Sequence, residues 1–243
     1  MSVSVFYPLG GGSPINNDEI RYSLRSIEKH LKNYGEIFII GRKPEWLQNV
    51  HFIEYEDLTP YKEKNIFTKT LMACEIKEMS EDFLFFNDDH FLVDDFDAPT
   101  FPYFYKCELQ RTIQRLNGGK YKRALTNTFA ELYARGKPLL NFDTHTPIVY
   151  NKEKMKSLAT MYPWERYDVG FVLKSLYANT FDCLPIHEYD VKIDQANMEM
   201  GKILDIIQGK KVFSIGNNIL QPSSDAILKT LNHLYPNKSK YEK

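Results

Sequence analysis

A short acidic segment is the part of this sequence best suited to chemistry. The apolar run from Phe83 to Phe86 predicts a buried β-strand, and the segment from Asn87 to His90 follows it directly. Open α/β sheets bind ligands outside the carboxyl ends of their strands, where the carboxylates of Asp88 and Asp89 would repel one another unless a cation or proton lay between them. Oxygen ligands on a turn suit Mg²⁺ or Mn²⁺, with substrate phosphates completing the shell. The segment therefore indicates a metal-diphosphate site, although a plain turn with helix-capping side chains has the same composition.

The elements around this segment predict a mostly parallel α/β sheet flanked by helices. Apolar periodicity and the positions of glycine, proline and polar residues predict strands at 3–7, 36–40, 51–55, 83–86, 148–150 and 212–216, and helices at 19–31, 66–79, 169–177 and 223–234. Strands and helices alternate in the first hundred residues, as they do in nucleotide-binding domains. The acidic segment would then lie at the edge of the sheet where such domains bind ligands.

Several residues near the acidic segment could contact the phosphates of a donor. Gly10 and Gly11 belong to a glycine run after the first strand, where backbone N–H groups can approach a ligand closely. Lys62 and Lys64 precede the helix at 66–79, whose N-terminal end also attracts an anion. Arg21 lies on the first predicted helix. We predict that these five residues contribute to the donor site, with a plain loop and solvated basic side chains as the alternatives.

Length, composition and charge limit the class of protein. The 243 residues are 43% hydrophobic, enough for a buried core in one domain or a closely joined pair. The formal net charge of −1 predicts no general attraction to nucleic acid or membrane, so a polyanion would have to bind a local patch. Three widely spaced cysteines indicate a reducing compartment. Because we find no signal peptide and no apolar run long enough to span a bilayer, we expect a soluble cytoplasmic protein without a membrane partner.

Four segments resemble conserved blocks of the Stealth family of sugar-phosphate transferases, namely Ile20–Lys29, Ile37–Gly41, Pro44–Leu47 and Phe83–Asp89. The chain is also similar to GT-A-type nucleotide-diphospho-sugar glycosyltransferases, which include the phage and kinetoplastid TET-associated enzymes that glucosylate hydroxymethylated pyrimidines in DNA. The resemblance is strongest over residues 15–95. It implies a single GT-A-like (Rossmann-like) domain, with a nucleotide-sugar-binding half at 1–100, an acceptor-binding half at 101–210 and a C-terminal strand and helix at 211–243. A bacterial or phage-infected cell is the implied location.

The resemblance also implies roles for the acidic segment. GT-A enzymes hold a divalent metal through an Asp-x-Asp signature, which corresponds here either to Asn87 and Asp89 or to Asp88 and His90. This departure from the strict pattern leaves the first ligand open. We predict that Asp89 binds Mn²⁺ or Mg²⁺ and that Asp88 contributes to binding the donor, a nucleotide-diphospho-sugar of which a UDP-sugar is the first choice.

Residues from the second half of the chain could complete the site. Asp143 and His145 are two apart in an extended segment, so their side chains point to the same side. His145 also matches a His-x-Pro segment of Stealth proteins, and His187 corresponds to a late histidine of the GT-A fold, so the two compete for a place at the metal. Asp168 could simply cap the helix at 169–177, whereas the resemblance implies a general base. We predict that Asp168 or Asp143 takes the acceptor proton.

The stretch from Tyr103 to Lys137 bears on the acceptor. It carries eight basic residues against Glu108 and Glu131, with six tyrosines and phenylalanines among them. Basic residues contact phosphates and aromatic rings can stack on unpaired bases, so the stretch could bind DNA, although a solvated helix face with core aromatics would look the same.

We therefore expect a metal-dependent glycosyltransferase that moves a hexose from a donor such as UDP-glucose to a hydroxyl, with hydroxymethylcytosine or a related pyrimidine of phage DNA as the first choice of acceptor. One alternative is a Stealth-type transfer of sugar 1-phosphate to a glycan, which breaks a different bond of the diphosphate. The other is a non-catalytic module that binds nucleotides or nucleic acid. The sequence leaves the sugar, the stereochemical outcome and the oligomeric state open.

Overall fold

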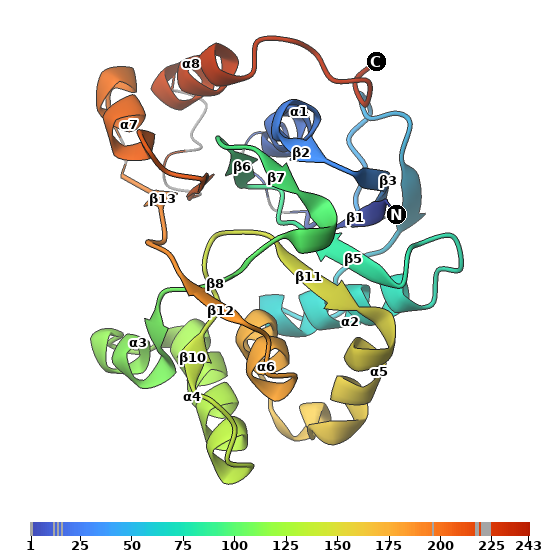
Figure 1. Cartoon of the computed structure of the whole chain (residues 1–243), viewed down its shortest axis with the longest axis vertical. Helices are drawn as coiled ribbons and strands as arrows, with labels where there is room; N and C mark the ends of the chain where they lie inside the picture. The colour runs from blue at the N-terminus through green and yellow to red at the C-terminus, as the bar shows by residue number, and fades with distance from the viewer. Residues whose placement is uncertain are drawn as a thin grey trace.

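The main sheet has the strand order β11-β5-β1-β3-β4 in the computed structural model, which describes residues 2–11, 13, 15, 17–195, 197–216, 219 and 225–243 (Figure 1). Its strands are β1 (Val3–Pro8), β3 (Tyr34–Gly41), β4 (His51–Glu54), β5 (Asp82–Phe85) and β11 (Ile148–Asn151). The first four run parallel, and β11 pairs antiparallel with β5. The mostly parallel α/β fold predicted from the sequence is confirmed.

Alternating side chains of these strands build a separate core on each face of the sheet. Phe6 and Phe85 point to one face, where they pack with α2 (Lys62–Cys74) and α5 (Lys152–Met161). Tyr7 and Leu84 point to the other face, which α1 (Glu19–His30) covers through Ile20, Leu24 and Ile27. The sheet is therefore buried on both sides, and its strand ends are where polar side chains can reach a ligand.

A second sheet of three strands continues from the acidic turn. It has the order β13-β14-β6 and consists of β6 (His90–Leu92), β13 (Lys192–Ile193) and β14 (Val212–Ile215). α7 (Met200–Ile207) and α8 (Asp225–Leu234) pack on it through a third apolar cluster. The turn from Phe86 to Asp89 is thus held between β5 of the main sheet and β6 of this one.

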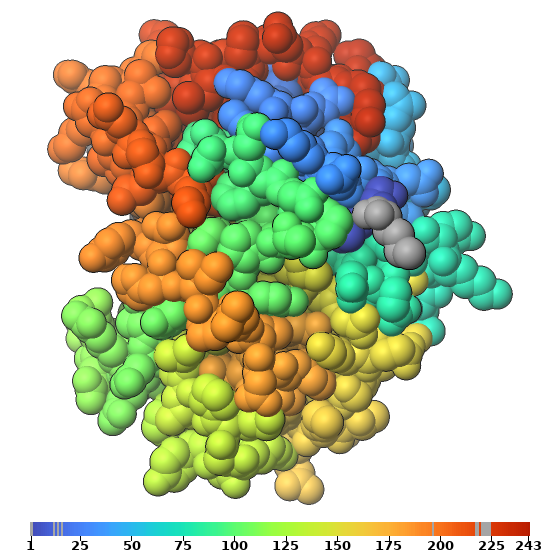
Figure 2. Space-filling model, in the orientation of Figure 1, coloured from blue at the N-terminus to red at the C-terminus, as the bar shows by residue number. Residues whose placement is uncertain are grey.

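The middle of the chain forms the lower part of the molecule in the view of Figures 1 and 2, while the first and last segments form the upper part. Its elements are β8 (Tyr103–Tyr105), β9 (Cys107–Glu108), α3 (Leu109–Arg115), α4 (Gly119–Ala134), β10 (Leu140–Asn141), α6 (Leu173–Thr180) and β12 (Pro185–His187). β8 pairs with β12, and β9 with β10. The remaining elements are the pair β2 (Leu31–Lys32) and β7 (Phe96–Asp97), and the 3₁₀ turns η1 (Ala98–Thr100) and η2 (Trp164–Arg166).

Two of the predicted helices begin at other residues than the sequence indicates. α2 begins at Lys62, four residues before the predicted start at 66. The first turn is charged and lacks apolar periodicity, but lysine and glutamate are good helix formers. α6 begins at Leu173 and not at 169, because Gly170 has a φ of +77°, which a helix cannot contain. The helix expected at 223–234 is α8, and the first two residues of that prediction, like Gly12 of the glycine run, lie outside the described residues.

The division at residues 100 and 210 stays a prediction. Strand pairing crosses both boundaries, since β11 completes the main sheet and β14 pairs with β6. No described helix combines the length and the apolar character needed to cross a membrane.

Candidate functional site

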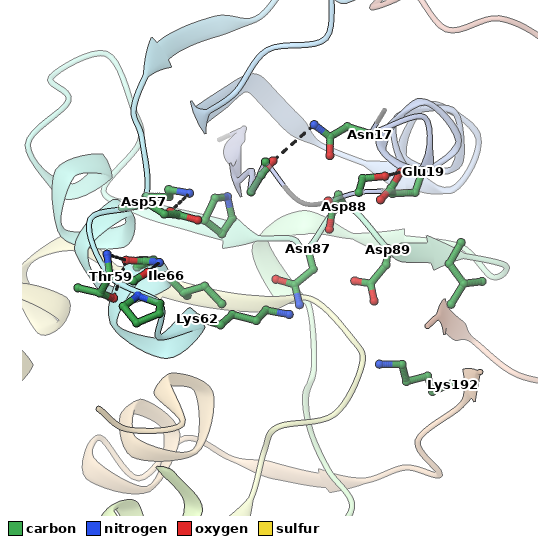
Figure 3. Close-up of a pocket in the computed structure, with 18 of the residues that line it drawn as sticks. Asn17, Glu19, Asp57, Thr59, Lys62, Ile66, Asn87, Asp88, Asp89 and Lys192 are labelled. Carbon is green, nitrogen blue, oxygen red and sulfur yellow. Dashed lines mark hydrogen bonds and ion pairs between the residues drawn. The ribbon is translucent and has the colours of Figure 1, made fainter. Parts of the chain in front are cut away.

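A polar cleft of about 560 Å³ opens where β1 and β5 end (Figure 3). The loop after β1 contributes Gly10 and Gly11, and the turn after β5 contributes Asn87 to Asp89. The N-terminal turns of α2 line another side, and Lys192 and Asp194 come from β13 and the residue after it. The cleft therefore lies where parallel α/β sheets bind ligands, and it contains the acidic segment identified in the sequence.

The acidic turn carries more negative charge than its surroundings balance. Burial, and after it the neighbouring carboxylates of Asp89 and Glu19, raise the pKa of Asp88 to about 7 against the opposing effect of Lys62. Glu19 is itself buried, which raises its pKa, and its carboxylate accepts a hydrogen bond of 2.8 Å from the Ser13 hydroxyl. Figure 3 places Asp88 beside Glu19 and Asp89 on the open side of the turn. A cation in this cleft would relieve the repulsion among these carboxylates.

Two lysines approach the turn from different elements. Lys62 is exposed to solvent at the cleft. Partial desolvation would lower its pKa, but the nearby carboxylates, Asp89 and Asp88 first, outweigh that effect and the pKa is raised. In Figure 3 the Lys62 ammonium points toward Asn87, and Lys192 reaches in from the opposite side, below Asp89. No pattern in the sequence indicates Lys192, because it lies about a hundred residues beyond the turn on a two-residue strand.

Lys69 has a different function in the same cleft. Its side chain is 3% exposed, and its ammonium donates to the Leu9 carbonyl at 2.9 Å and pairs with Asp57 at 2.6 Å. Both bonds join α2 to the segments after β1 and β4. Lys69 therefore fixes the start of the glycine loop, and it is already paired in the structure.

The predicted metal ligands do not come together. Among the described residues, no three His, Cys, Asp or Glu side chains form a group that could hold a metal ion. His145 and His187 lie outside the lining of the cleft. His90 is fully buried, and its ring accepts a hydrogen bond of 3.3 Å from the Asn87 backbone N–H. It therefore stabilises the turn and is not available as a metal ligand. A divalent cation would fit here with Asp88 and Asp89 as protein ligands and with oxygens of a bound ligand completing its shell.

A histidine–carboxylate pair forms a second polar group. The Nδ1 atom of His145 lies 2.8 Å from one oxygen of Asp190, which also accepts the His145 backbone N–H at 2.8 Å. The other oxygen pairs with the Lys106 ammonium at 2.9 Å. Burial would raise the pKa of Asp190, but His145 and Lys106 together hold it far below its usual range. An ionised Asp190 fixes the imidazole and leaves its Nε2 for another partner.

Lys174 connects this pair with the cleft. Its buried ammonium donates to the carbonyls of Thr144 and Thr146, on either side of His145, at 2.9 and 2.7 Å. Burial lowers the pKa of Lys174 to about 8, and the carboxylates of Asp143, Asp89 and Asp190 oppose that fall. The acidic turn and the histidine pair therefore act on one common cation.

Asp143 lies in the same group but is not free. It accepts a hydrogen bond of 2.7 Å from the Tyr121 hydroxyl. Burial would raise its pKa, but Lys174, Lys106 and Tyr121 outweigh burial and the pKa is lowered. A carboxylate held in its ionised form in this way accepts a proton poorly, so His145 fits the predicted role of base better than Asp143.

Arg21 and Lys64, two predicted donor contacts, lie outside the cleft lining. The Arg21 guanidinium pairs with Asp18 at 3.0 Å and Glu242 at 2.9 Å and lies over the Trp46 ring. The Lys64 side chain lies next to Gly170, on the opposite side of α2 from the acidic turn. Both side chains are used in packing, so these positions do not favour phosphate contact.

Asp168 and His187 are also away from the cleft. Asp168 is half-exposed, pairs with Arg123 at 2.8 Å and accepts the Val169 N–H at 2.8 Å, so it forms a local turn and does not cap α6. His187 lies on β12 between two aromatic rings. The prediction of Asp168 as general base is therefore not supported by its position.

Part of the basic and aromatic stretch is used within the chain. Four of its eight basic residues pair with acids: Lys106 with Asp190, Arg123 with Asp168, Arg135 with Glu131 and Lys137 with Asp182. Phe104 is buried, and the Tyr121 hydroxyl donates to Asp143. Arg111 and Arg115 of α3 are exposed. The paired and buried residues fit the alternative of a solvated helix face with core aromatics, and DNA as the acceptor stays a prediction.

The fold is that of GT-A glycosyltransferases. The chain aligns with the crystal structure of galactosyltransferase LgtC in complex with donor and acceptor sugar analogs, with a TM-score of 0.51 and 11% identity, over 98% of this chain and 96% of that one. An active-site mutant of LgtC aligns equally well, with a TM-score of 0.51 and 12% identity. At this identity the likeness establishes the fold alone.

Sequence comparison then gives the closer relationship. Residues 14–111 match the family model described as Stealth protein CR2, conserved region 2. The chain is 33% identical over 103 residues to the capsular polysaccharide phosphotransferase WcwK of Streptococcus pneumoniae, covering 35% of this chain and 31% of that protein. It is 26% identical over 187 residues to the capsular polysaccharide phosphotransferase cps12A of Actinobacillus pleuropneumoniae, covering 68% and 49%. The chain thus spans half or less of these two relatives. The resemblance to Stealth proteins with a GT-A fold is confirmed, and the relatives are transferases, as predicted.

Proposed function

We propose that this chain is the catalytic domain of a transferase that moves a sugar 1-phosphate from a nucleotide-diphospho-sugar to a hydroxyl group of a glycan. One observation carries the proposal: the adjacent carboxylates Asp88 and Asp89 share a strand-end cleft with the ammonium groups of Lys62 and Lys192. Such a mixture of charges suits a diphosphate together with a divalent cation. The names of the relatives favour phosphosugar transfer over the glycosyl transfer to DNA that we first expected.

The donor diphosphate would bind in the cleft. Lys62 and Lys192 approach the acidic turn from two sides and would bind phosphate oxygens, and Gly10 and Gly11 would let the backbone approach the nucleotide. Asp88 and Asp89 would hold Mg²⁺ or Mn²⁺. When bound, the ion supplies positive charge that offsets the charge on the departing phosphate.

The acceptor hydroxyl would be activated by His145. Its Nε2 would accept the hydroxyl proton, while Asp190 holds the Nδ1–H and stabilises the imidazolium that forms. The acceptor oxygen would form a bond with the phosphorus that carries the sugar. The bond between that phosphorus and the bridging oxygen breaks, and a nucleoside monophosphate leaves with the electron pair. Lys174 would keep the loop around His145 in place through its two carbonyl contacts.

Product analysis tests the proposal. The protein would be incubated with Mn²⁺, capsular oligosaccharides and each of a panel of UDP-, GDP- and CDP-sugars, and the nucleotide products separated by ion-exchange chromatography. We expect a nucleoside monophosphate and a glycan heavier by one phosphosugar. A nucleoside diphosphate as the product would indicate glycosyl transfer. No turnover of any donor, together with binding of a nucleoside diphosphate, would leave a non-catalytic nucleotide-binding domain.

A further inference from the structure

Three aromatic rings form a row on the paired strands β8 and β12. His187 is paired in register with Tyr105, and their ring centroids are 5.3 Å apart in an edge-to-face arrangement. Tyr189 follows two residues after His187, and its ring centroid lies 5.4 Å from the imidazole, again edge-to-face. Residues two apart on an extended chain share a face, so the row follows from the strand geometry.

The outer end of this row is open to solvent. Tyr189 is 72% exposed, and His187 is exposed along with the rest of β12. The Lys210 ammonium lies 5.5 Å from the Tyr189 ring centroid. Exposed aromatic rings bordered by charged groups are typical of ligand-binding surfaces, because ordinary solvent-facing positions gain little from a large ring.

The chain that carries the row continues directly into the histidine pair. Tyr189 directly precedes Asp190, which holds His145, and Lys192 of the cleft is only two residues further. At about 3.3 Å per residue, this segment spans roughly 10 Å between the exposed ring and the cleft. On the other strand, Tyr105 packs at 6.1 Å against Phe142, next to Asp143, and Lys106 pairs with Asp190. The two chain segments that carry the row therefore also carry Lys106 and Asp190, which hold the group that would take the acceptor proton.

We propose that Tyr105, His187 and Tyr189 form the subsite that binds the acceptor glycan, an inference that rests on the proposed function. The C–H faces of sugar rings carry partial positive charge and stack on the negative faces of aromatic rings. Sugar hydroxyls would at the same time find a polar partner beside the row, at the Lys210 ammonium. A sugar bound to His187 and Tyr189 would direct the next residue of its chain toward His145.

Glycan binding without a donor is the first test. An array of bacterial capsular oligosaccharides would be probed with the wild-type chain and with the variants Tyr189→Ala and His187→Ala. Tyr133→Ala is the matched control, because Tyr133 is 69% exposed, lies on α4 and also stacks on a neighbouring ring, that of Phe129. We expect about tenfold weaker binding for each variant of the row, the loss that 1.4 kcal/mol represents, and an unchanged affinity for the control.

Steady-state kinetics with the best glycan of the array is the second test. Tyr189→Ala should raise the KM for the acceptor about tenfold and leave the KM for the donor unchanged, since the ring is remote from the acidic turn. Equal glycan affinity of wild type and Tyr189→Ala, or no binding by wild type to any glycan on the array, would overturn the subsite.

Calorimetry with UDP, GDP and CDP in the presence of Mn²⁺ separates this failure from a failure of the proposed function. If a nucleotide binds and the aromatic variants leave glycan affinity unchanged, only the subsite is refuted. Absence of nucleotide binding would refute the donor site itself.

Discussion

The carboxylate of Glu242 should stabilise the fold without contributing to donor binding. Its side chain is fully buried, and it pairs with Arg25 at 2.7 Å and Arg21 at 2.9 Å while accepting the Ser239 N–H at 2.9 Å. The substitution Glu242→Gln keeps the shape of the side chain but leaves the Arg25 guanidinium without its counter-charge and Arg21 with Asp18 alone. Loss of one partner from a buried pair is strongly destabilising, because the remaining charge is uncompensated.

The size of the effect follows from the pKa. Burial would raise the pKa of Glu242, but Arg25, the Ser239 N–H and Arg21 lower it from 4.5 to about 2. At about 1.4 kcal/mol per pKa unit this corresponds to at most about 3 to 4 kcal/mol, and solvent screening of the partly exposed Arg21 reduces our expectation to about 2 kcal/mol. Because the folded pKa is the lower one, this contribution is complete above pH 4.5 and is lost as the pH falls toward 2.

Urea unfolding at several pH values measures this contribution. We expect the difference in unfolding free energy between wild type and Glu242→Gln to be about 2 kcal/mol at pH 7 and to shrink between pH 4.5 and pH 2. Glu36→Gln is the control, because Glu36 pairs only with the exposed His51 and its removal should change stability by less than about 0.5 kcal/mol. Equal stability of wild type and Glu242→Gln at pH 7, or a loss of nucleotide affinity in the folded variant, would refute the reasoning and return Arg21 to the donor site.

Three further results are expected. Asp89→Asn should weaken Mn²⁺-dependent binding of UDP at least tenfold in calorimetry without lowering the thermal midpoint, since it removes one of two repelling charges; retained binding would remove Asp89 from the metal site. Asp190→Asn should lower kcat by about 10² to 10⁴ with donor affinity unchanged, the range expected when general base catalysis is lost; an unaltered kcat would exclude the histidine pair from the reaction. Gly41→Ala should destabilise the fold by about 3 kcal/mol or more, because Gly41 has a φ of +144° and a Cβ atom would lie 1.8 Å from the Leu9 oxygen. Gly10→Ala, with open space around it, should not, and similar unfolding midpoints for the two glycine variants would contradict this account.

The fold could be predicted wherever the spacing of apolar residues in the sequence matches the side chains that are buried in the structure. The strands β1, β3 and β5 are apolar on both faces because helices cover both, and this makes them continuous apolar runs. The acidic turn was found because it interrupts such a run abruptly. α6 was placed four residues early, since the apolar period continues through Gly170 although the backbone there has a positive φ.

The second half of the site could not be predicted, because its parts are distant in the sequence. Asp190 contacts His145 across 45 residues, and neither residue has a local pattern that indicates the other. Lys192 reaches the cleft from a two-residue strand that no periodicity can identify. From the sequence, Asp168 could be a helix cap or a general base. The observed ion pair with Arg123 shows instead that it belongs to a surface turn.

The pairing of β6 with β14 also determines when the site can form during synthesis. The acidic turn lies between β5 and β6, and β6 gains its partner only when residues 212–215 are available, about 120 residues after the turn. Lys192 comes nearly as late. Contacts so far apart in sequence form slowly, because a long loop must close before they can stabilise anything. A nascent chain that ends before β14 would expose the apolar side chain of Phe91 next to an incomplete cleft, so donor binding should appear only after nearly all of the described chain has left the ribosome.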